Sequence, residues 1–125
     1  MENELLKTVH RIYEKDPVAT VYAADDVFVT VVGMAASDVE GVLGLSDLNT
    51  GELQTKLNIK TLSRCLRFDF SEEQTSVLIG LIIEAGSNLL KVSEAVQIKV
   101  MSSVKDYIGT ELDRVNIQIS DVRTK

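Results

Sequence analysis

The sequence predicts an α+β fold: a single domain with a small mixed β-sheet on which helices pack. Three patterns support this class. Residues 65–84 have the pattern of a β-hairpin, residues 88–109 carry a long helical stripe, and residues 114–122 alternate apolar with polar side chains. The chain has 125 residues, of which 45% are apolar and 26% charged, as expected for one soluble domain with one core.

The first residues have the spacing of an amphipathic helix. Before Pro17 ends the pattern, apolar side chains recur at helical intervals: Leu5, Leu6, Val9, Ile12 and Tyr13. We therefore expect an N-terminal amphipathic helix over residues 1–17 and the α+β domain over residues 18–125. Lysine and arginine on the outer face of this helix are interspersed with glutamate, which favours a solvated face over a membrane-binding one.

Residues 27–32 (VFVTVV) fit either a strand or a helix. Their β-branched composition favours a strand, but the segment does not alternate strictly. As a helix that begins near Asp25 and Asp26, the segment is apolar nearly all round, which indicates a buried helix. We favour the helix. Close packing of this helix is then allowed by its small residues, Gly33, Ala35 and Ala36. Gly41 and Gly44 turn the chain out of the helix.

The remaining elements complete a βαββαβ order after the N-terminal helix. A short strand near Tyr22 opens this order, and residues 46–57 form a polar loop. The hairpin follows, with a first strand over residues 65–70 and a second that is apolar on both faces over residues 77–83. Such a strand is central and is covered by helices or by a second subunit. The last helix starts at residues 87–88, ends at Gly109 and carries an apolar stripe: Val92, Ala95, Val96, Val100, Val104, Tyr107 and Ile108.

The glycines of residues 29–46 (VTVVGMAASDVEGVLGLS) invite a phosphate-binding interpretation. The GVLG of residues 41–44 has the spacing of an RNA-binding GxxG loop, but no Walker sequence or dinucleotide fingerprint is present. From residue 16 to residue 55 there is no lysine or arginine, while seven acids occur: Asp16, Asp25, Asp26, Asp38, Glu40, Asp47 and Glu52. These acids and the net charge of −6 repel phosphate, so we expect no nucleotide or nucleic-acid partner.

The residues that could carry chemistry do not form a recognisable catalytic or metal-binding set. Two pairs of adjacent acids fit caps or turns better than a metal site: Asp25/Asp26 and Glu72/Glu73. His10 is the one histidine, lacks a second ligand at helical spacing and is expected at the surface. Cys65 could be a nucleophile only if His10 reached it from a distant element. We therefore expect no catalytic or metal-binding residue, no cofactor and no enzymatic activity, and the binding residues stay unknown.

The sequence also lacks the marks of export and of membrane insertion. The N-terminus mixes acidic and basic residues, and no apolar run approaches the roughly 18 residues of a membrane span. A single cysteine cannot form an internal disulfide, which fits a reducing compartment. We expect a cytoplasmic protein that reaches the membrane only through a partner.

Two blocks of sequence match the pattern of a known family. The first ends a helix in an A-A-x-x-V-E-G-V-x-G run: Gly33, Ala35, Ala36, Val39, Glu40, Gly41, Val42, Gly44 and Leu45. The second has a glycine, a V-Q-x-x-V helix and a closing strand of the V-N-V-x-V type: Gly86, Val92, Val96, Gln97, Val100, Gly109, Val115, Asn116 and Val122. The chain thus resembles, over about residues 20–122, the alkaline shock protein family of envelope stress proteins, also called YloU-like. It departs from the family at Ala85, where an aromatic residue is common, and in the segment SRCLRFDF.

The resemblance implies a cytoplasmic protein of one mixed α/β domain, linked to cell-envelope homeostasis in Gram-positive bacteria. It implies no cofactor and no enzymatic activity; some family members self-assemble, and some are held at the membrane by a separate anchor protein. We therefore expect a non-catalytic, self-associating scaffold or adaptor near the membrane, with a membrane anchor protein as partner. The alternative is a regulatory subunit or ligand-binding module that modulates an enzyme, such as one of lipid metabolism.

Overall fold

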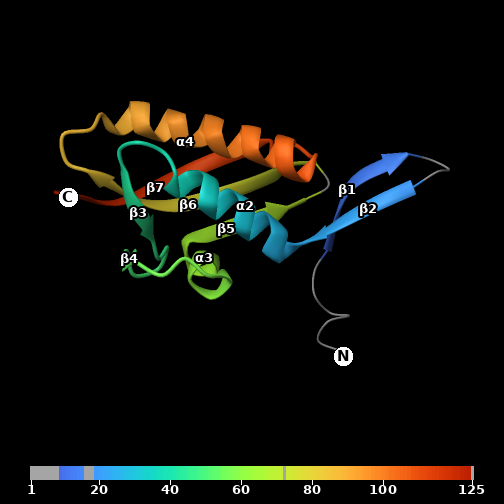
Figure 1. Ribbon diagram of the computed structural model, residues 1–125, viewed down its shortest axis with the longest axis horizontal. Coiled ribbons are helices and arrows are strands. Elements are labelled where there is room, and N and C mark those ends of the chain that lie inside the picture. The colour runs from blue at the N-terminus through green and yellow to red at the C-terminus, as the bar shows by residue number, and fades with distance from the viewer. Residues whose placement is uncertain (1–8, 16–18, 72, 125) are drawn as a thin grey trace.

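The computed structural model describes residues 9–15, 19–71 and 73–124 (Figure 1). Their elements follow in chain order: β1 (Val9–Lys15), β2 (Ala19–Ala24), α2 (Asp25–Ser37), β3 (Val42–Ser46), β4 (Leu53–Gln54), α3 (Ile59–Cys65), β5 (Leu66–Phe70), β6 (Thr75–Glu84), α4 (Leu89–Ser103), the π-helical turn η1 (Val104–Ile108) and β7 (Arg114–Arg123). Strands β3 to β7 form a mixed sheet, and β1 and β2 form a separate hairpin. The predicted α+β class is confirmed.

Strand β6 is the centre of the mixed sheet. Along one edge it pairs in parallel with β7, from Ser76 opposite Arg114 to Glu84 opposite Arg123. Two strands share its other edge, because β5 pairs antiparallel with residues 75–79 and β3 with residues 81–83. The short β4 extends the sheet beyond β3. Since parallel neighbours need a crossover connection, α4 links β6 to β7 across one face of the sheet.

Helices α2 and α4 lie side by side on that face (Figure 1). Their inner side chains meet alternate residues of β6 in a single core: Phe28, Val32, Ala36, Val96, Val100, Val77, Ile79, Leu81 and Ile83. Helix α3 joins this core through Leu62. The Leu62 side chain lies so close to Gly33 that a Cβ added to this glycine would be only 2.7 Å from Leu62 Cδ2. Gly33, Ala35 and Ala36 are all buried, so their predicted role in close packing is confirmed.

The opposite face of β6 is covered by the chain that leaves β3. A Cβ added to Gly80 would be much closer to the Ser46 backbone oxygen than van der Waals contact allows. The chain therefore crosses β6 directly over this glycine. Beyond the crossing, the Ser46 and Ser120 hydroxyls lie 2.7 Å apart, and Gln118 Nε2 donates to the Leu48 oxygen at 3.2 Å. Residues 79–83 are consequently buried within one chain. The apolar strand needs no second subunit to cover it.

The N-terminal helix predicted over residues 1–17 is wrong for residues 9–15, which form β1. This strand pairs antiparallel with β2, and the pairing register shifts between Arg11 and Tyr13, as at a β-bulge. A bulge inserts an extra residue into a strand, so the apolar positions fall three or four residues apart and imitate helical spacing. The rest of the predicted helix, residues 1–8 and 16–17, lies outside the described residues.

The mixed sheet does not contain the first strand that the sequence predicted for it. The strand near Tyr22 exists as β2, but among the described residues it pairs with β1 alone. Its place in the sheet is taken by β3, which lies in the glycine-containing stretch after α2. Gly41 turns the chain as predicted, with a φ of +94, whereas Gly44 lies inside β3 and ends no helix.

The predicted hairpin of β5 and β6 is confirmed, with a correction at its start. Cys65, which was expected to begin the first strand, is the last residue of α3. The sequence patterns missed this helix because its seven residues make only two turns, too few for a clear apolar period. Asn58 begins it with a capping box, in which the Asn58 side chain accepts from Thr61 N and the Thr61 side chain accepts from Asn58 N.

The C-terminal half follows the prediction closely. Helix α4 begins after Asn88, whose side chain accepts a hydrogen bond from the Lys91 backbone at 3.0 Å. The helical segment ends at Gly109, which adopts a φ of +88, as a terminating glycine does. Strand β7 then runs where the alternating pattern of residues 114–122 places it.

Replacing Gly80 by alanine should destabilise the fold, because the new Cβ meets backbone that cannot rotate away. We expect the free energy of unfolding, measured by urea denaturation, to fall by roughly 1–3 kcal/mol, the usual cost of an extra methyl group in a packed interior. Gly44→Ala is the matched control, since its Cβ meets only the end of the flexible Leu53 side chain. Equal losses in both variants would contradict a tight crossing at Gly80.

Candidate functional site: an apolar groove between two helices

The geometry around Cys65 is that of a structural thiol and not of a nucleophile. Cys65 is fully buried, and its Sγ donates to the Thr61 oxygen at 3.3 Å inside α3. Burial raises the pKa of the thiol from 9.0 to about 11, and the negative charge of Asp47 adds to the rise. The thiolate needed for nucleophilic attack is therefore scarcely populated at neutral pH.

His10 is held in an aromatic cluster where β1 meets the domain. Its ring stacks on Phe70, with centroids 3.4 Å apart, and meets the edge of Phe28 at 5.6 Å. Its Nε2 also contacts the Asp25 carboxylate at the start of α2. The expected surface position is therefore only partly right, because the side chain is 16% exposed. These contacts dock β1 and β2 onto the domain.

The acids singled out in the sequence are spread over several elements. Asp25 and Asp26 lie in the first turn of α2, and Glu73 is exposed in the turn before β6. Within the described residues, no group of three His, Cys, Asp or Glu side chains is placed to hold a metal ion. In the GVLG of residues 41–44, Gly41 is a turn residue and the other three residues begin β3. The segment therefore forms no loop that could clamp a phosphate backbone.

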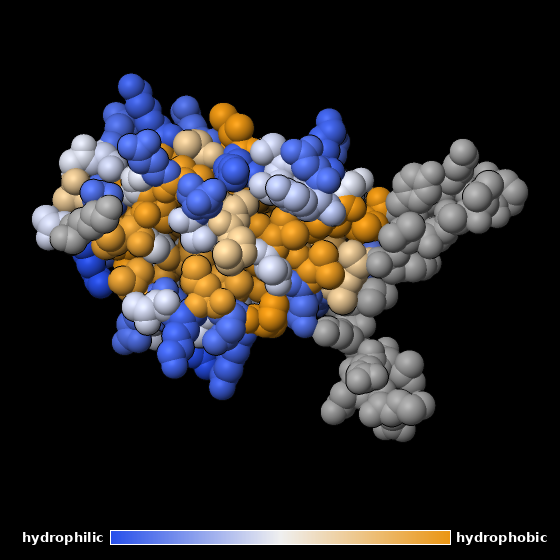
Figure 2. Space-filling view, viewed as in Figure 1, coloured by the Kyte–Doolittle hydropathy of each residue, from blue (hydrophilic) through white to orange (hydrophobic). Residues whose placement is uncertain are grey.

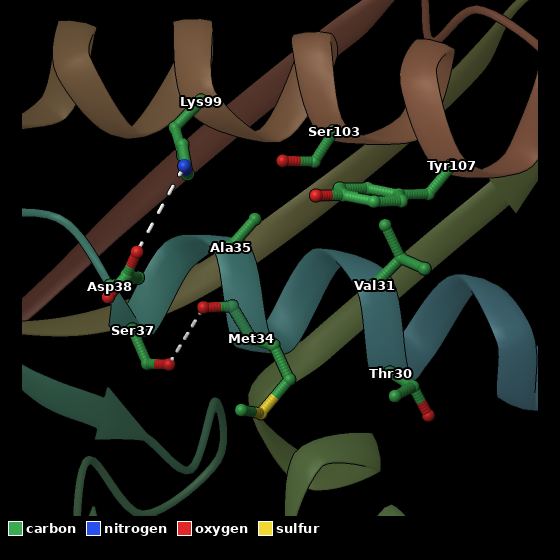
Figure 3. A pocket seen from close by; sticks show the side chains of 9 residues that line it. All are labelled: Thr30, Val31, Met34, Ala35, Ser37, Asp38, Lys99, Ser103 and Tyr107. Carbon is green, nitrogen blue, oxygen red and sulfur yellow. Dashed lines mark hydrogen bonds and ion pairs between the residues drawn. The ribbon is translucent and has the colours of Figure 1, made fainter.

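A groove of about 440 Å³ lies between α2 and α4. Its lining comes from α2, α4, η1 and the residue after α2: Thr30, Val31, Met34, Ala35, Ser37, Asp38, Lys99, Ser103 and Tyr107. In Figure 3, Val31 and Ala35 point from α2 toward α4, while Ser103 and Tyr107 point back toward α2. Met34 points away from α4, along the outer face of α2.

The floor of the groove lies between a charged end and an aromatic end. Ala35 and Ser103 are each 7% exposed and form the floor. Lys99 Nζ lies 4.0 Å from the Asp38 carboxylate at one end, and the Tyr107 ring is 80% exposed at the other. Such a surface can take apolar side chains and orient them by one ion pair and a few hydroxyl groups, but it holds no reactive group.

The position of Tyr107 depends on the π-helical turn. The sequence placed Tyr107 on the same stripe as Val100 and Val104, which are buried, but Tyr107 is exposed. In η1 the Gly109 backbone donates to the Val104 oxygen at 3.0 Å, a bond that spans five residues. The wider turn rotates Tyr107 away from the sheet and toward α2. Ala95 also departs from the predicted stripe and is exposed.

Sequence comparison assigns the family. The sequence profile of the alkaline shock protein family, described as having a cell envelope-related function, matches residues 13–124. The chain belongs to this family. The match spans the mixed sheet and the three α-helices of the described residues, so the resemblance drawn from residues 29–45 and 82–122 is confirmed.

Relatives of this alkaline shock family member come from Gram-positive bacteria. The uncharacterised protein YloU of Bacillus subtilis is 30% identical over 102 residues, which cover 80% of this chain and 85% of YloU. The uncharacterised protein Spy1614 of Streptococcus pyogenes is 24% identical, covering 80% of this chain and 84% of that protein. A stress response regulator gls24 homolog of Streptococcus pyogenes is also 24% identical, but only 57% of its length is covered. No solved structure matches.

In the part of this family member that the structure describes, no helix is both long and apolar enough to cross a membrane.

The buried thiol predicts a specific loss of stability at high pH. Because the native pKa of about 11 exceeds the unfolded value of 9.0, both states hold the proton below pH 9, and only the native state holds it as the pH rises further. The free energy of unfolding should therefore fall by on the order of 2 kcal/mol through this group between about pH 9 and pH 11. Denaturation of Cys65→Ala over the same range should show a shallower decline, and identical slopes would contradict the assignment.

Proposed function

We propose that this family member is a non-catalytic protein of the cytoplasm that acts as a self-associating scaffold or adaptor near the membrane. The observation that carries the proposal is the distribution of exposed apolar side chains. Among the described residues, five of the ten large apolar side chains that are exposed lie on α4 and η1: Leu89, Leu90, Ile98, Met101 and Tyr107. Exposed apolar side chains gathered on one element are typical of a surface that binds another protein.

Three of these side chains border two separate surfaces, as a scaffold requires. Tyr107 borders the groove beside α2, whereas Ile98 and Met101 border hollows on the side of α4 next to β7. Figure 2 shows apolar side chains across the middle of the face that carries α2, with hydrophilic side chains above and below. One surface can therefore bind a partner while the other binds a second copy of the chain.

The chemistry of the chain supports a binding role over a catalytic one. Cys65 is buried as a neutral thiol, and His10 is engaged by Asp25 and Phe70. The family description, a cell envelope-related function, agrees with a role beside the membrane. The net charge of −6 opposes direct adsorption to anionic lipid, so we infer that a membrane anchor protein brings the chain to the membrane.

The groove between α2 and α4 is the surface we assign to this partner. Tyr107→Glu, which places a charge at its exposed aromatic end, should reduce the amount of co-purified partner at least about tenfold, because a charge would be buried in the contact. The measurement is affinity purification from the native cell with membranes retained, followed by identification of the bound proteins. Leu90→Glu is the matched control, since Leu90 is 75% exposed on the same helix and does not line the groove.

A small membrane protein that is lost with Tyr107→Glu and kept with Leu90→Glu would support the adaptor role. A soluble enzyme among the bound proteins would instead favour a regulatory subunit. If sedimentation at micromolar concentration shows only monomer, and neither membrane pelleting nor purification finds a partner, the proposed function is wrong.

A further inference from the structure

The outer surface of α4 carries a row of four residues with a symmetric chemical order. Glu94, Ile98, Met101 and Lys105 are spaced by four, three and four positions, so they lie along one face of the helix and its continuation into η1. We call these four residues the α4 crest. Ile98 is 70% exposed and Met101 36%, while the charged residues at the two ends are both exposed. An acid, two apolar side chains and a base thus follow one another.

Two hollows on the side of α4 next to β7 border the α4 crest and share its apolar residues. One hollow, of about 550 Å³, lies between Ile98, Met101 and the start of β7. The other, of about 430 Å³, lies between the same two side chains, Lys105 and Leu112. A projecting ridge bordered by hollows is the shape that two packed helices need, because the side chains of each helix then fill the grooves of the other.

The order of residues in the crest is complementary to itself when reversed. A two-fold axis midway between Ile98 and Met101 would place Ile98 against the partner's Met101 and Glu94 opposite the partner's Lys105. The spacing is equal on both sides, since Glu94 precedes Ile98 by four residues and Lys105 follows Met101 by four. Under two-fold symmetry each of these contacts occurs twice.

We propose that a second copy of this chain docks antiparallel along the α4 crest to form a symmetric dimer. This inference rests on the self-association in the proposed function and assigns its surface. Charge complementarity favours the second copy as the occupant, because reversal sets the one acid of the crest opposite the one base of the partner's crest. The hollows beside the crest add two acids and one base, Glu111, Asp113 and Arg114. Lys105 Nζ lies 3.6 Å from Glu111 within the chain, but this exposed ion pair is weak and can be exchanged.

Charge reversal tests the contact. Glu94→Lys and Lys105→Glu should each weaken dimerisation by roughly tenfold or more, because each change turns two attractive pairs into two repulsive ones. The double variant Glu94→Lys/Lys105→Glu restores both pairs with reversed polarity, so its dissociation constant should return to within about threefold of the wild-type value. The measurement is sedimentation equilibrium of the full chain over a range of micromolar concentrations.

Asp106→Lys is the control for charge reversal, since Asp106 is exposed in η1 and lines neither the groove beside α2 nor the two hollows at the crest. It should dimerise as the wild type does, and all variants should keep the wild-type unfolding midpoint because the changed side chains are exposed.

If the wild type associates but the single reversals do not weaken it, or the double variant is not restored, the crest is not the interface and the proposed function stands. If the wild type is monomeric throughout, this inference and the proposed self-association are both wrong, while the adaptor role is judged by its own test.

Discussion

The fold depends on the direct contact of backbone with Gly80. Strand β6 gives one edge to β7 and divides the other between β3 and β5, so β3 has to leave the sheet where β5 begins. It leaves by crossing over Gly80, which any larger residue would block. The crossing carries the chain to hydrogen bonds with β7 on the far edge, including the one from Gln118 to Leu48. Strand β6 is thereby covered on the face opposite α2 and α4.

Because both faces of β6 are covered within the chain, the apolar side chains that stay exposed belong mainly to the helices. Helix α4 packs its inner face on β6 through Val96 and Val100, and it exposes Ile98 on the opposite side. These outer side chains contribute no burial free energy to the isolated domain. The free energy of burying them would be gained only when another molecule covers them. The exposed apolar surface therefore lies mainly on the helices and not on the sheet.

The two surfaces of α4 have different chemistry because of how the helix ends. The π-helical turn rotates Tyr107 toward α2, where it joins Val31 and Ala35 in an apolar groove. Without this turn the tyrosine would lie on the stripe of Val100 and Val104, against the sheet. On the other side the regular α-helical spacing continues far enough to align Ile98 and Met101. The π-helical turn thus gives Tyr107 a different environment from Val100 and Val104.

The sequence by itself determined the elements whose signals are local and long: helix α2, the hairpin of β5 and β6, helix α4 and strand β7. The small residues around Gly33 also predicted that α2 packs closely, which the structure confirms, while the acids around Gly41 support only the expectation that phosphate does not bind there. The tertiary structure alone decided the pairing of β1 with β2, the strand formed by residues 42–46, the short helix α3 and the groove at Tyr107. A bulged strand, a strand with a glycine, a helix of two turns and a π-helical turn all lack a clear local period, so contacts between residues distant in sequence determine them.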